Sequence, residues 1–280
     1  MSLNPQKELH LMLKHRLITG IILLIVALAL LLYLPIKAFM IATTILFLYA
    51  AWEWSRLIQI TRYRYRILYV VVIALSFYAA IYFHTVGLLT VAIIWWVVVL
   101  LNLVAEERYH RNLLNQFWLK ALMGLLTLTP AWIALNMIRL AQNGIAVLLF
   151  LLCLIWISDT GAYFVGKGFG KHRLAPHISP KKTWEGLYGG VLSALLVGLL
   201  GAITLKIPPP QWPQILLLSF LTTLFSVVGD LFESQLKRQA RLKDSGAIFP
   251  GHGGLLDRLD SLMAAAPIFL GACFWLGLRF

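Results

Sequence analysis

The run LITGIILLIVALALLLYL, residues 17–34, contains no charged side chain. An α-helix rises 1.5 Å per residue, so about 20 apolar residues cross a hydrocarbon core about 30 Å thick. Basic residues precede this run, as they precede a signal peptide, but Pro35-Ile36-Lys37 follows it in place of a small-residue cleavage site. We therefore expect a retained membrane anchor helix.

Eight further apolar segments follow along the chain. They lie near residues 38–54, 67–83, 85–104, 119–136, 145–164, 186–205, 214–232 and 261–278. Hydrophobic residues make up 60% of the sequence and charged residues only 12%, whereas a soluble globular protein carries about 25% charged residues. The sequence predicts an all-α, polytopic helical membrane protein with about nine transmembrane helices, and it excludes a soluble single domain.

The distribution of Lys and Arg predicts how these helices are oriented. With a cytoplasmic N-terminus, 20 of the 24 Lys and Arg residues fall in cytoplasmic segments, which satisfies the positive-inside rule. The net charge of +13 is then explained by topology and by attraction to anionic lipid headgroups, and it does not indicate nucleic acid. Arg62, Arg64 and Arg66 are expected to act only in these two ways. We expect a multi-pass protein of the inner (cytoplasmic) membrane.

The acidic residues indicate where chemistry takes place. All eleven Asp and Glu residues fall at or near the expected cytoplasmic side, and all five Asp residues follow residue 158. The positive-inside rule gives no reason for this gathering. We therefore divide the chain into an N-terminal transmembrane region, residues 1–140 with spans 1–5, and a C-terminal catalytic transmembrane region, residues 141–280 with spans 6–9. The cytoplasmic loops of the catalytic region are expected at 165–185 and 233–258.

The first polar stretch combines glycines with lysines. It reads SDTGAY at 158–163, GKGFGK at 166–171 and SPKKTWEG at 179–186. Glycine lets a backbone approach a ligand closely, and exposed amides beside lysines suit phosphate oxygens. No Gly-Lys pair is followed by Ser or Thr, so this is not a Walker motif. GKGFGK is either a phosphate-binding loop or a helix end at the membrane surface, whereas SPKKTWEG favours a substrate role.

The second polar stretch, residues 226–260, carries paired carboxylates. Asp230 and Glu233 share one helix face at i, i+3, and Asp257 and Asp260 share another. A carboxylate near hydrocarbon costs a few kcal/mol, so it should face a cavity, a cation or a metal. Oxygen ligands favour magnesium, which typically uses one or two carboxylates together with substrate phosphates.

Two residues of this stretch have an alternative interpretation. Glu233 can form an ordinary i, i+4 pair with Lys237. His252, set among glycines, is either a general base or a hydrogen-bonding partner of the backbone. The sequence contains no nucleophile triad and no His-x-x-x-His pair.

The spacing of fixed residues from Ser234 to Asp260 resembles the complete signature of the phosphatidate cytidylyltransferase family, whose members are also called CDP-diacylglycerol synthases. The matching residues are Ser234, Leu236, Lys237, Arg238, Lys243, Asp244, Gly246, Phe249, Pro250, His252, Gly253, Gly254, Leu255, Asp257, Arg258, Leu259 and Asp260. SDTGAY, SPKKTWEG and AWEW at 51–54 resemble the same family, so the resemblance covers most of the chain.

This resemblance implies transfer of the cytidylyl group of CTP to phosphatidate, which gives CDP-diacylglycerol and pyrophosphate for phospholipid biosynthesis. It also implies a membrane-embedded homodimer that depends on magnesium and has a site open to the cytoplasm and to membrane lipids. By the family pattern, Asp230 and Asp257 belong to a magnesium centre that includes a second, monovalent cation such as K⁺.

The charged residues suit that reaction. A phosphate monoester has a second pKa of about 6, so the nucleophile is already mostly anionic at pH 7 and needs no strong base. Repulsion between phosphatidate, the triphosphate and the leaving pyrophosphate must be overcome by a metal and by Lys and Arg side chains. The expected catalytic residues are Asp230, Asp257, Asp260, Lys182 and Arg258. The expected substrate-binding residues are Ser179, Lys181, Lys182, Lys237, Arg238, Lys243, His252, Gly253 and Gly254.

Two other functions compete with this one. A CTP-dependent lipid-alcohol kinase, acting on a polyprenol-type alcohol, needs a base for the hydroxyl group and does not account for the full signature. A transporter needs charges along a path to both sides, but the outer halves of the spans lack acids and no inverted repeat is evident.

Overall fold

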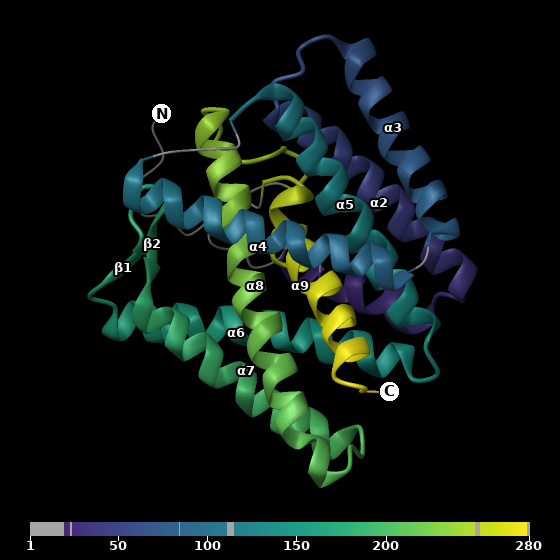
Figure 1. Ribbon diagram of the computed structural model, residues 1–280, viewed down its shortest axis with the longest axis vertical. Coiled ribbons are helices and arrows are strands. Elements are labelled where there is room, and N and C mark those ends of the chain that lie inside the picture. Colours follow the sequence, from purple (N-terminus) through teal and green to yellow (C-terminus); the bar gives the residue numbers. More distant parts are fainter. Residues whose placement is uncertain (1–19, 23, 84, 111–114, 250–252, 279–280) are drawn as a thin grey trace, which may run out of the picture.

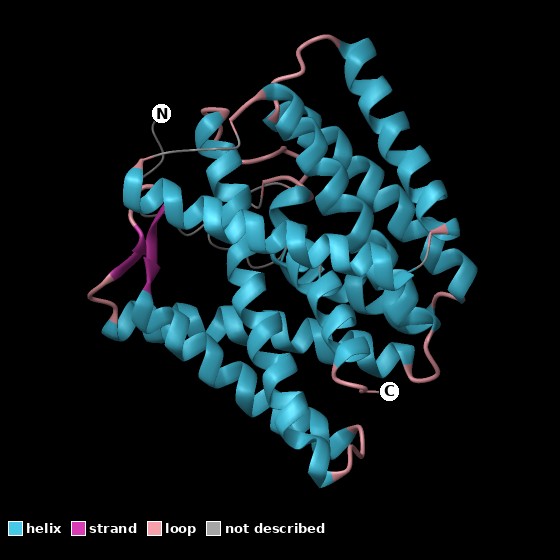
Figure 2. Ribbon diagram, in the orientation of Figure 1, coloured by secondary structure: helices cyan, strands magenta, loops and turns pink. Residues whose placement is uncertain are grey.

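The computed structural model describes residues 20–22, 24–83, 85–110, 115–249 and 253–278, which form a helical bundle with one β-hairpin (Figures 1 and 2). The long helices are α2 (Ile36–Leu57), α3 (Tyr63–Tyr82), α4 (Thr85–Tyr109), α5 (Phe117–Leu140), α6 (Gly144–Phe169), α7 (Trp184–Thr204), α8 (Trp212–Gln239) and α9 (Leu256–Trp275). A shorter apolar helix, Gly20–Tyr33, precedes them. The antiparallel strands β1 (Arg173–Ala175) and β2 (Ser179–Thr183) separate α6 from α7, and the 3-10 helix η1 (Pro209–Gln211) precedes α8.

Over the residues that the structure describes, each of the nine expected apolar segments overlaps a helix. In the described chain, seven helices, α2 to α8, are long and apolar enough to cross a membrane. The Gly20–Tyr33 helix is shorter, and α9 begins with the charged residues Asp257, Arg258 and Asp260. The polytopic helical class is therefore confirmed, while the count of nine spans and the cytoplasmic N-terminus stay predictions.

Helix α9 occupies the centre of the molecule, where it packs against α8, α5 and α4 (Figure 1). Its small residues Ala264, Ala265 and Ala266 are fully buried. The hydrophobic effect that drives helices together in water does not act between helices surrounded by lipid. Close packing at small residues and interhelical hydrogen bonds stabilise their association instead. One such hydrogen bond runs from Thr43 Oγ1 on α2 to Asn136 Oδ1 on α5 at 3.2 Å.

The loop expected at 165–185 is shorter than the sequence suggested. Helix α6 continues through Phe169, and the amide of Gly170 donates to the carbonyl oxygen of Gly166 at 3.0 Å. GKGFGK therefore includes a helix end, as one of the two interpretations expected, and its Gly166 and Lys167 line a pocket described below, so a phosphate-binding role stays a prediction. The β-hairpin that follows was not predicted, since its strands are three and five residues long.

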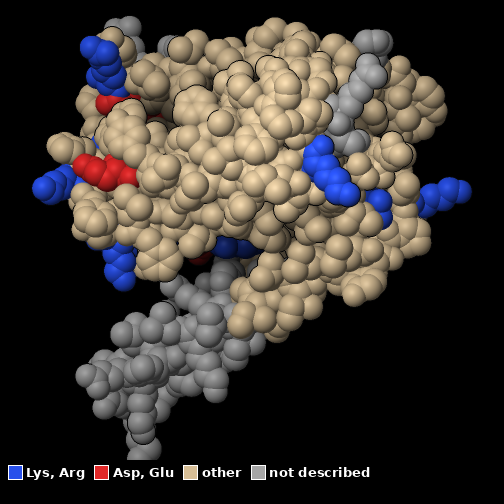
Figure 3. All heavy atoms as spheres, turned by 90° about the horizontal axis from the view of Figure 1, so that it is seen from below, with Lys and Arg blue, Asp and Glu red and all other residues tan. Residues whose placement is uncertain are grey.

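The connections lie at two ends of the helices. The hairpin and the α8–α9 connection lie towards the top and left of Figure 1, whereas η1 and the end of α9 lie towards the bottom and right. On the face drawn in Figure 3, the acidic side chains gather at the left with several Lys and Arg side chains, and a wide uncharged surface separates them from the basic side chains at the right. This distribution matches a chain that crosses an apolar layer.

Candidate active site

A pocket of about 640 Å³ opens between α6, the hairpin, α7 and α8. Strand β2 supplies Ser179, Lys181 and Lys182, all of which the sequence predicted as substrate-binding residues. Lys167 and Arg173 add two further cationic side chains to the lining. A concave site with this many cations suits a polyanion such as a triphosphate.

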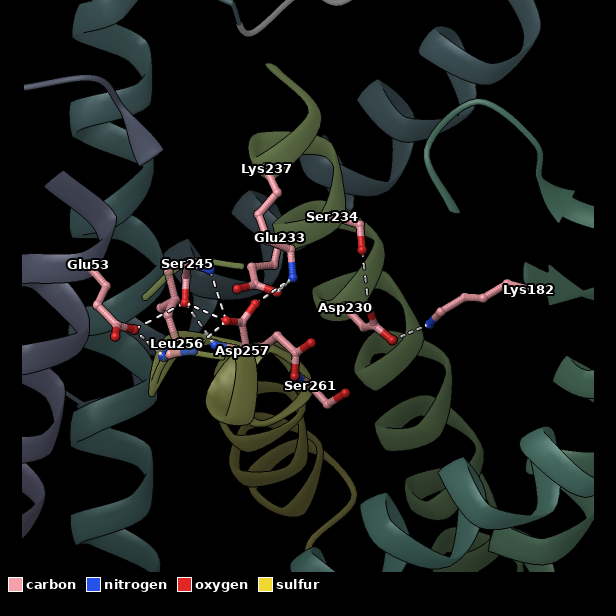
Figure 4. A network of polar contacts seen from close by, with 12 residues as sticks. Glu53, Lys182, Asp230, Glu233, Ser234, Lys237, Ser245, Leu256, Asp257 and Ser261 are labelled. Atoms are coloured by element: carbon pink, nitrogen blue, oxygen red, sulfur yellow. Dashed lines mark hydrogen bonds and ion pairs between the residues drawn. The ribbon is translucent and has the colours of Figure 1, made fainter. Parts of the chain in front are cut away.

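Asp230 faces the hairpin from α8. Its Oδ2 lies 2.6 Å from Nζ of Lys182, and its Oδ1 accepts from Ser234 Oγ at 3.4 Å (Figure 4). The two charged side chains are 31% and 23% exposed, so a ligand in the pocket can reach both. Asp159 lines the same pocket from α6, and both Asp159 and Asp260 lie within electrostatic range of Asp230.

Asp159 is a pocket residue that the sequence reasoning did not assign to the site. The signal was present in SDTGAY, a polar motif inside an apolar segment, where an ionisable residue generally marks function. Lys182 of the hairpin thus contacts Asp230 on α8 and lies within electrostatic range of Asp159 on α6 and Asp260 on α9.

Lys237 is held by two carboxylates of the neighbouring cluster. Its Nζ lies 2.6 Å from Oε2 of Glu233 and 2.6 Å from Oδ1 of Asp257. The expected i, i+4 pair with Glu233 is therefore present. The side chains of Glu233 and Asp257 are only 1% and 6% exposed, so both ion pairs with Lys237 are buried. Removing any one of the three charges would leave a buried charge without compensation.

Asp257 also organises the connection between α8 and α9. Its Oδ2 accepts from the amide of Ser245 at 2.9 Å, from Ser245 Oγ at 2.9 Å and from the amide of Gly254 at 2.7 Å. Gly253 has a φ of +79°, and a Cβ there would lie 2.6 Å from Oδ2 of Asp257. Glycine is needed at 253 both for the backbone angle and for the space.

The two aspartates predicted as metal ligands thus belong to different contacts. Asp230 pairs with Lys182, whereas Asp257 pairs with Lys237 (Figure 4). The described residues include no group of three or more His, Cys, Asp or Glu side chains arranged to hold a metal ion. Magnesium does not need such a group, because one or two carboxylates suffice when substrate phosphates complete its shell. Asp230, with two carboxylates nearby and an open pocket in front of it, fits that requirement.

The remaining predicted residues lie outside the lining of this pocket. Arg238, Lys243 and Arg258 are exposed on the last turn of α8, the α8–α9 connection and the first turn of α9. Gly254 is buried against the Asp257 carboxylate, and Asp260 Oδ1 accepts from the amide of Ser261 at 2.8 Å. His252 lies outside the described residues.

Comparison with known proteins gives one family. The model of the Cytidylyltransferase family matches residues 14–276. A phosphatidate cytidylyltransferase of Pseudomonas aeruginosa is 37% identical over 94% of this chain and 97% of its own length, and one of Haemophilus influenzae is 32% identical over 92% and 97%. A phosphatidate cytidylyltransferase of Bacillus subtilis is 44% identical over 49% of this chain and 51% of its own length.

Proposed function

Since the chain belongs to the cytidylyltransferase family, we infer that it is an enzyme that transfers the cytidylyl group of CTP to phosphatidate. The products are CDP-diacylglycerol and pyrophosphate, and the reaction serves phospholipid biosynthesis. The observation that carries this assignment is the Lys182–Asp230 pair in a cation-lined pocket, at 2.6 Å, in a chain whose helices suit a membrane.

The hairpin is well suited to hold the nucleotide. Ser179, Lys181 and Lys182 project from one strand into the pocket, where Lys167 and Arg173 complete a cationic lining. We assign these side chains to the triphosphate of CTP. We propose that Lys182 neutralises negative charge on the oxygens of the phosphate under attack, and the position of its ammonium group in the pocket beside Asp230 supports this role.

The chemical step is a substitution at the α-phosphorus of CTP. An oxygen of the phosphatidate phosphate forms a bond to this phosphorus while the bond to the bridging oxygen of pyrophosphate breaks. No proton has to leave the nucleophile, because a phosphate monoester is mostly dianionic at pH 7. Lys and Arg side chains therefore act by reducing repulsion among the phosphates.

We propose that Mg²⁺ is required and that Asp230 holds it, with Asp159 and Asp260 in electrostatic range. When bound, this ion supplies charge neutralisation at the phosphate oxygens. Asp257 stays a predicted ligand of the same centre, together with a monovalent cation such as K⁺. In this structure the oxygens of Asp257 accept from Lys237, Ser245 and Gly254.

We further propose a homodimer in the inner membrane with the pocket facing the cytoplasm. The excess of Lys and Arg on the pocket's side of the helices supports this orientation. A cytoplasmic opening would give the site access both to soluble CTP and to phosphatidate in the adjoining leaflet.

The test is a reconstitution with purified protein in mixed micelles. Labelled CTP and phosphatidate should give CDP-diacylglycerol only when both substrates and Mg²⁺ are present, and EDTA should abolish product formation. A polyprenol-type alcohol tested in place of phosphatidate addresses the kinase alternative. Phosphorylation of that alcohol, with no CDP-diacylglycerol from phosphatidate, would refute the assignment.

A further inference from the structure

Glu53 is a buried acid of the N-terminal half whose carboxylate reaches the α8–α9 connection. It lies near the end of α2 and is only 3% exposed. Its Oε2 accepts from the amide of Leu256 at 2.7 Å and from Ser245 Oγ at 3.1 Å, across 203 and 192 residues of sequence (Figure 4). Burying a carboxylate costs free energy unless hydrogen bonds or an ion pair compensate for the lost water. The presence of Glu53 in this buried position therefore needs an explanation.

The carboxylate takes the place of an N-cap for α9. The residue preceding this helix, Leu255, has no side-chain hydrogen bond to the first turn. The first amides of a helix lack partners within the helix, and a negative charge there is favourable. Glu53 satisfies the amide of Leu256 from another helix, and Asp257 satisfies that of Gly254. The start of α9 is therefore held by two carboxylates, one from each half of the chain.

Ser245 joins these two carboxylates. Its Oγ lies 3.1 Å from Oε2 of Glu53 and 2.9 Å from Oδ2 of Asp257, and the side chain is fully buried. A hydroxyl has one hydrogen to donate, so the two acids share it. Asp257 in turn binds Lys237 at 2.6 Å. A shift of Glu53 would therefore be transmitted through Ser245 to Asp257 and Lys237.

Two glycines of the signature are explained by the same carboxylate. A Cβ on Gly246 would collide with Oε1 of Glu53, and a Cβ on Gly254 would lie 2.5 Å from Oε2. Only glycine lets the connecting segment pass this close to the acid on both sides. The segment is thus shaped around Glu53.

We propose that Glu53 is a positioning residue for the reaction, which sets the start of α9 and, through Ser245, the orientation of Asp257 and Lys237. The inference rests on the proposed function, because the readout is CDP-diacylglycerol formation. It gives the N-terminal half a part in catalysis beyond anchoring the chain in the membrane.

The test compares three substitutions of Glu53 with a control on the same helix. Glu53→Ala removes the acceptor, Glu53→Asp withdraws it by about one bond length of 1.5 Å, and Glu53→Gln keeps an oxygen acceptor. Thr43→Val removes the buried α2–α5 hydrogen bond to Asn136 and leaves the α8–α9 connection untouched. All variants are checked for folding by size exclusion and thermal unfolding in detergent.

Glu53→Ala and Glu53→Asp should lower kcat at least about tenfold with KM for CTP changed less than about threefold, and Glu53→Gln should recover kcat to within about threefold of wild type. Thr43→Val should keep kcat within about twofold. If Glu53→Ala does not fold, Glu53→Asp decides. A folded Glu53→Asp with wild-type kcat, or a Gln variant as impaired as the Asp variant, would overturn the proposal.

A double-mutant cycle with Ser245→Ala separates positioning from a general loss of stability. Because Glu53 acts through Ser245, the effects of Glu53→Asp and Ser245→Ala on kcat should not multiply, whereas those of Thr43→Val and Ser245→Ala should. Multiplying effects in the first pair would count against the proposal. Wild-type protein that forms no CDP-diacylglycerol would instead refute the proposed function, so the two failures are distinguishable.

Discussion

Among single residues, Lys182 is the cation for which we predict a catalytic role. Its Nζ contacts Asp230 at 2.6 Å inside the pocket. We predict that Lys182→Ala lowers kcat at least about tenfold, a barrier increase of about 1.4 kcal/mol. Steady-state kinetics in mixed micelles, with CTP and phosphatidate varied separately, measure it. A similar loss is expected for Arg258→Ala, but there the family signature alone supports it, since Arg258 lies outside the pocket lining.

Arg64→Ala is the matched control for these variants. Arg64 is exposed and its guanidinium lies over the ring of Tyr65, so its loss should leave kcat within about twofold. Equal losses for Arg64→Ala and Lys182→Ala would mean that lipid attraction had been mistaken for catalysis. Arg66 is not a suitable control. It stacks over Trp52 at 3.8 Å and donates to Ser55 Oγ and to the Trp52 carbonyl, so it also packs against α2, and the expectation that it acts only by topology and lipid attraction is wrong.

Asp230 and Asp257 should differ in how a change to asparagine affects stability. Both variants are expected to lose turnover, and Asp230→Asn should also raise the Mg²⁺ concentration needed for any residual activity. Because the Asp230 side chain is 31% exposed, the Asp230→Asn protein should unfold at a temperature near that of wild type. Asp257→Asn places an NH₂ group against Lys237 or against backbone amides, which costs about 1–3 kcal/mol.

Kinetics against Mg²⁺ concentration and thermal unfolding in detergent measure the two effects. Equal unfolding temperatures for the two variants would contradict the prediction that Asp257 stabilises the fold. The sequence predicted both aspartates as functional from their place at span ends. It could not separate their partners, because Ser245, Gly254 and Lys237 reach Asp257 only through the folded connection.

At the scale of elements, the hairpin is fastened to the end of α4 by Glu107. The amide of His177 donates to Oε1 of Glu107 at 3.0 Å, and the amide of Ile178 does so at 2.8 Å. Because the hairpin carries the lysines of the pocket, Glu107→Ala should loosen the proposed nucleotide site. We expect KM for CTP to rise about three- to tenfold with a smaller change in kcat. Arg108→Ala, next on the same helix, is the control and should leave KM unchanged.

Helices α6 and α7 can approach closely because α7 has glycine where they meet. A Cβ on Gly189 would lie 2.5 Å from the side chain of Val165 on α6. Gly189→Ala should therefore force the helices apart and destabilise the protein by about 1–3 kcal/mol, a typical range for overpacking. Thermal unfolding in detergent measures the loss.

Gly168→Ala is the control for this contact, since nothing lies within 4 Å of a Cβ built there. Alanine is favoured over glycine inside a helix, so this variant should be as stable as wild type or more so. Destabilisation by both substitutions to a similar extent would show that the α6–α7 contact is not the cause, since a Cβ at position 168 meets no neighbour. Hydropathy predicted both helices but not this contact, because a run of apolar residues does not reveal which neighbour a helix meets.

The hairpin shows the limit of sequence patterns for elements. Its strands pair Arg173 with Thr183 and Ala175 with Ser179, too few residues for an alternating pattern to be distinguished from a loop. Ser179, Lys181 and Lys182, which line the pocket, were predicted as substrate-binding residues by residue type and motif. The sequence did not predict that these residues lie on a strand whose turn is held to α4 by Glu107. That contact joins Glu107 to His177, 70 residues further along the chain.

At the scale of the whole molecule, the class of fold followed from composition alone, since 60% hydrophobic residues with 12% charged ones leave few alternatives. The packing order of the helices did not. Helix α9 is the last along the chain, yet it fills the centre between α4, α5 and α8 (Figure 1). Nor did the pattern reveal that Glu53 holds the start of that helix, because the contact joins residues 203 positions apart.

Sidedness is the whole-molecule property that the sequence predicts most directly and that labelling can test. With 20 of 24 Lys and Arg residues on one side, the α8–α9 connection should face the cytoplasm and the turn before α8 the opposite side. Helix α8 has 28 residues, so about 42 Å separates these two positions. Ala247 and Pro209 are both exposed and can each carry a reporter cysteine.

We predict that Ala247→Cys reacts with a membrane-impermeant maleimide only in inverted vesicles, and Pro209→Cys only in right-side-out vesicles. Both are made in a background with Cys153 and Cys273 replaced by Ala, so that no native thiol reports. Ala247 is preferable to the adjacent Gly246, where any side chain would displace Glu53. Labelling of both cysteines from one side would remove α8 as a membrane span. Reversed labelling would place the Lys182–Asp230 pocket on the face away from cytoplasmic CTP, and the proposed orientation would then be wrong.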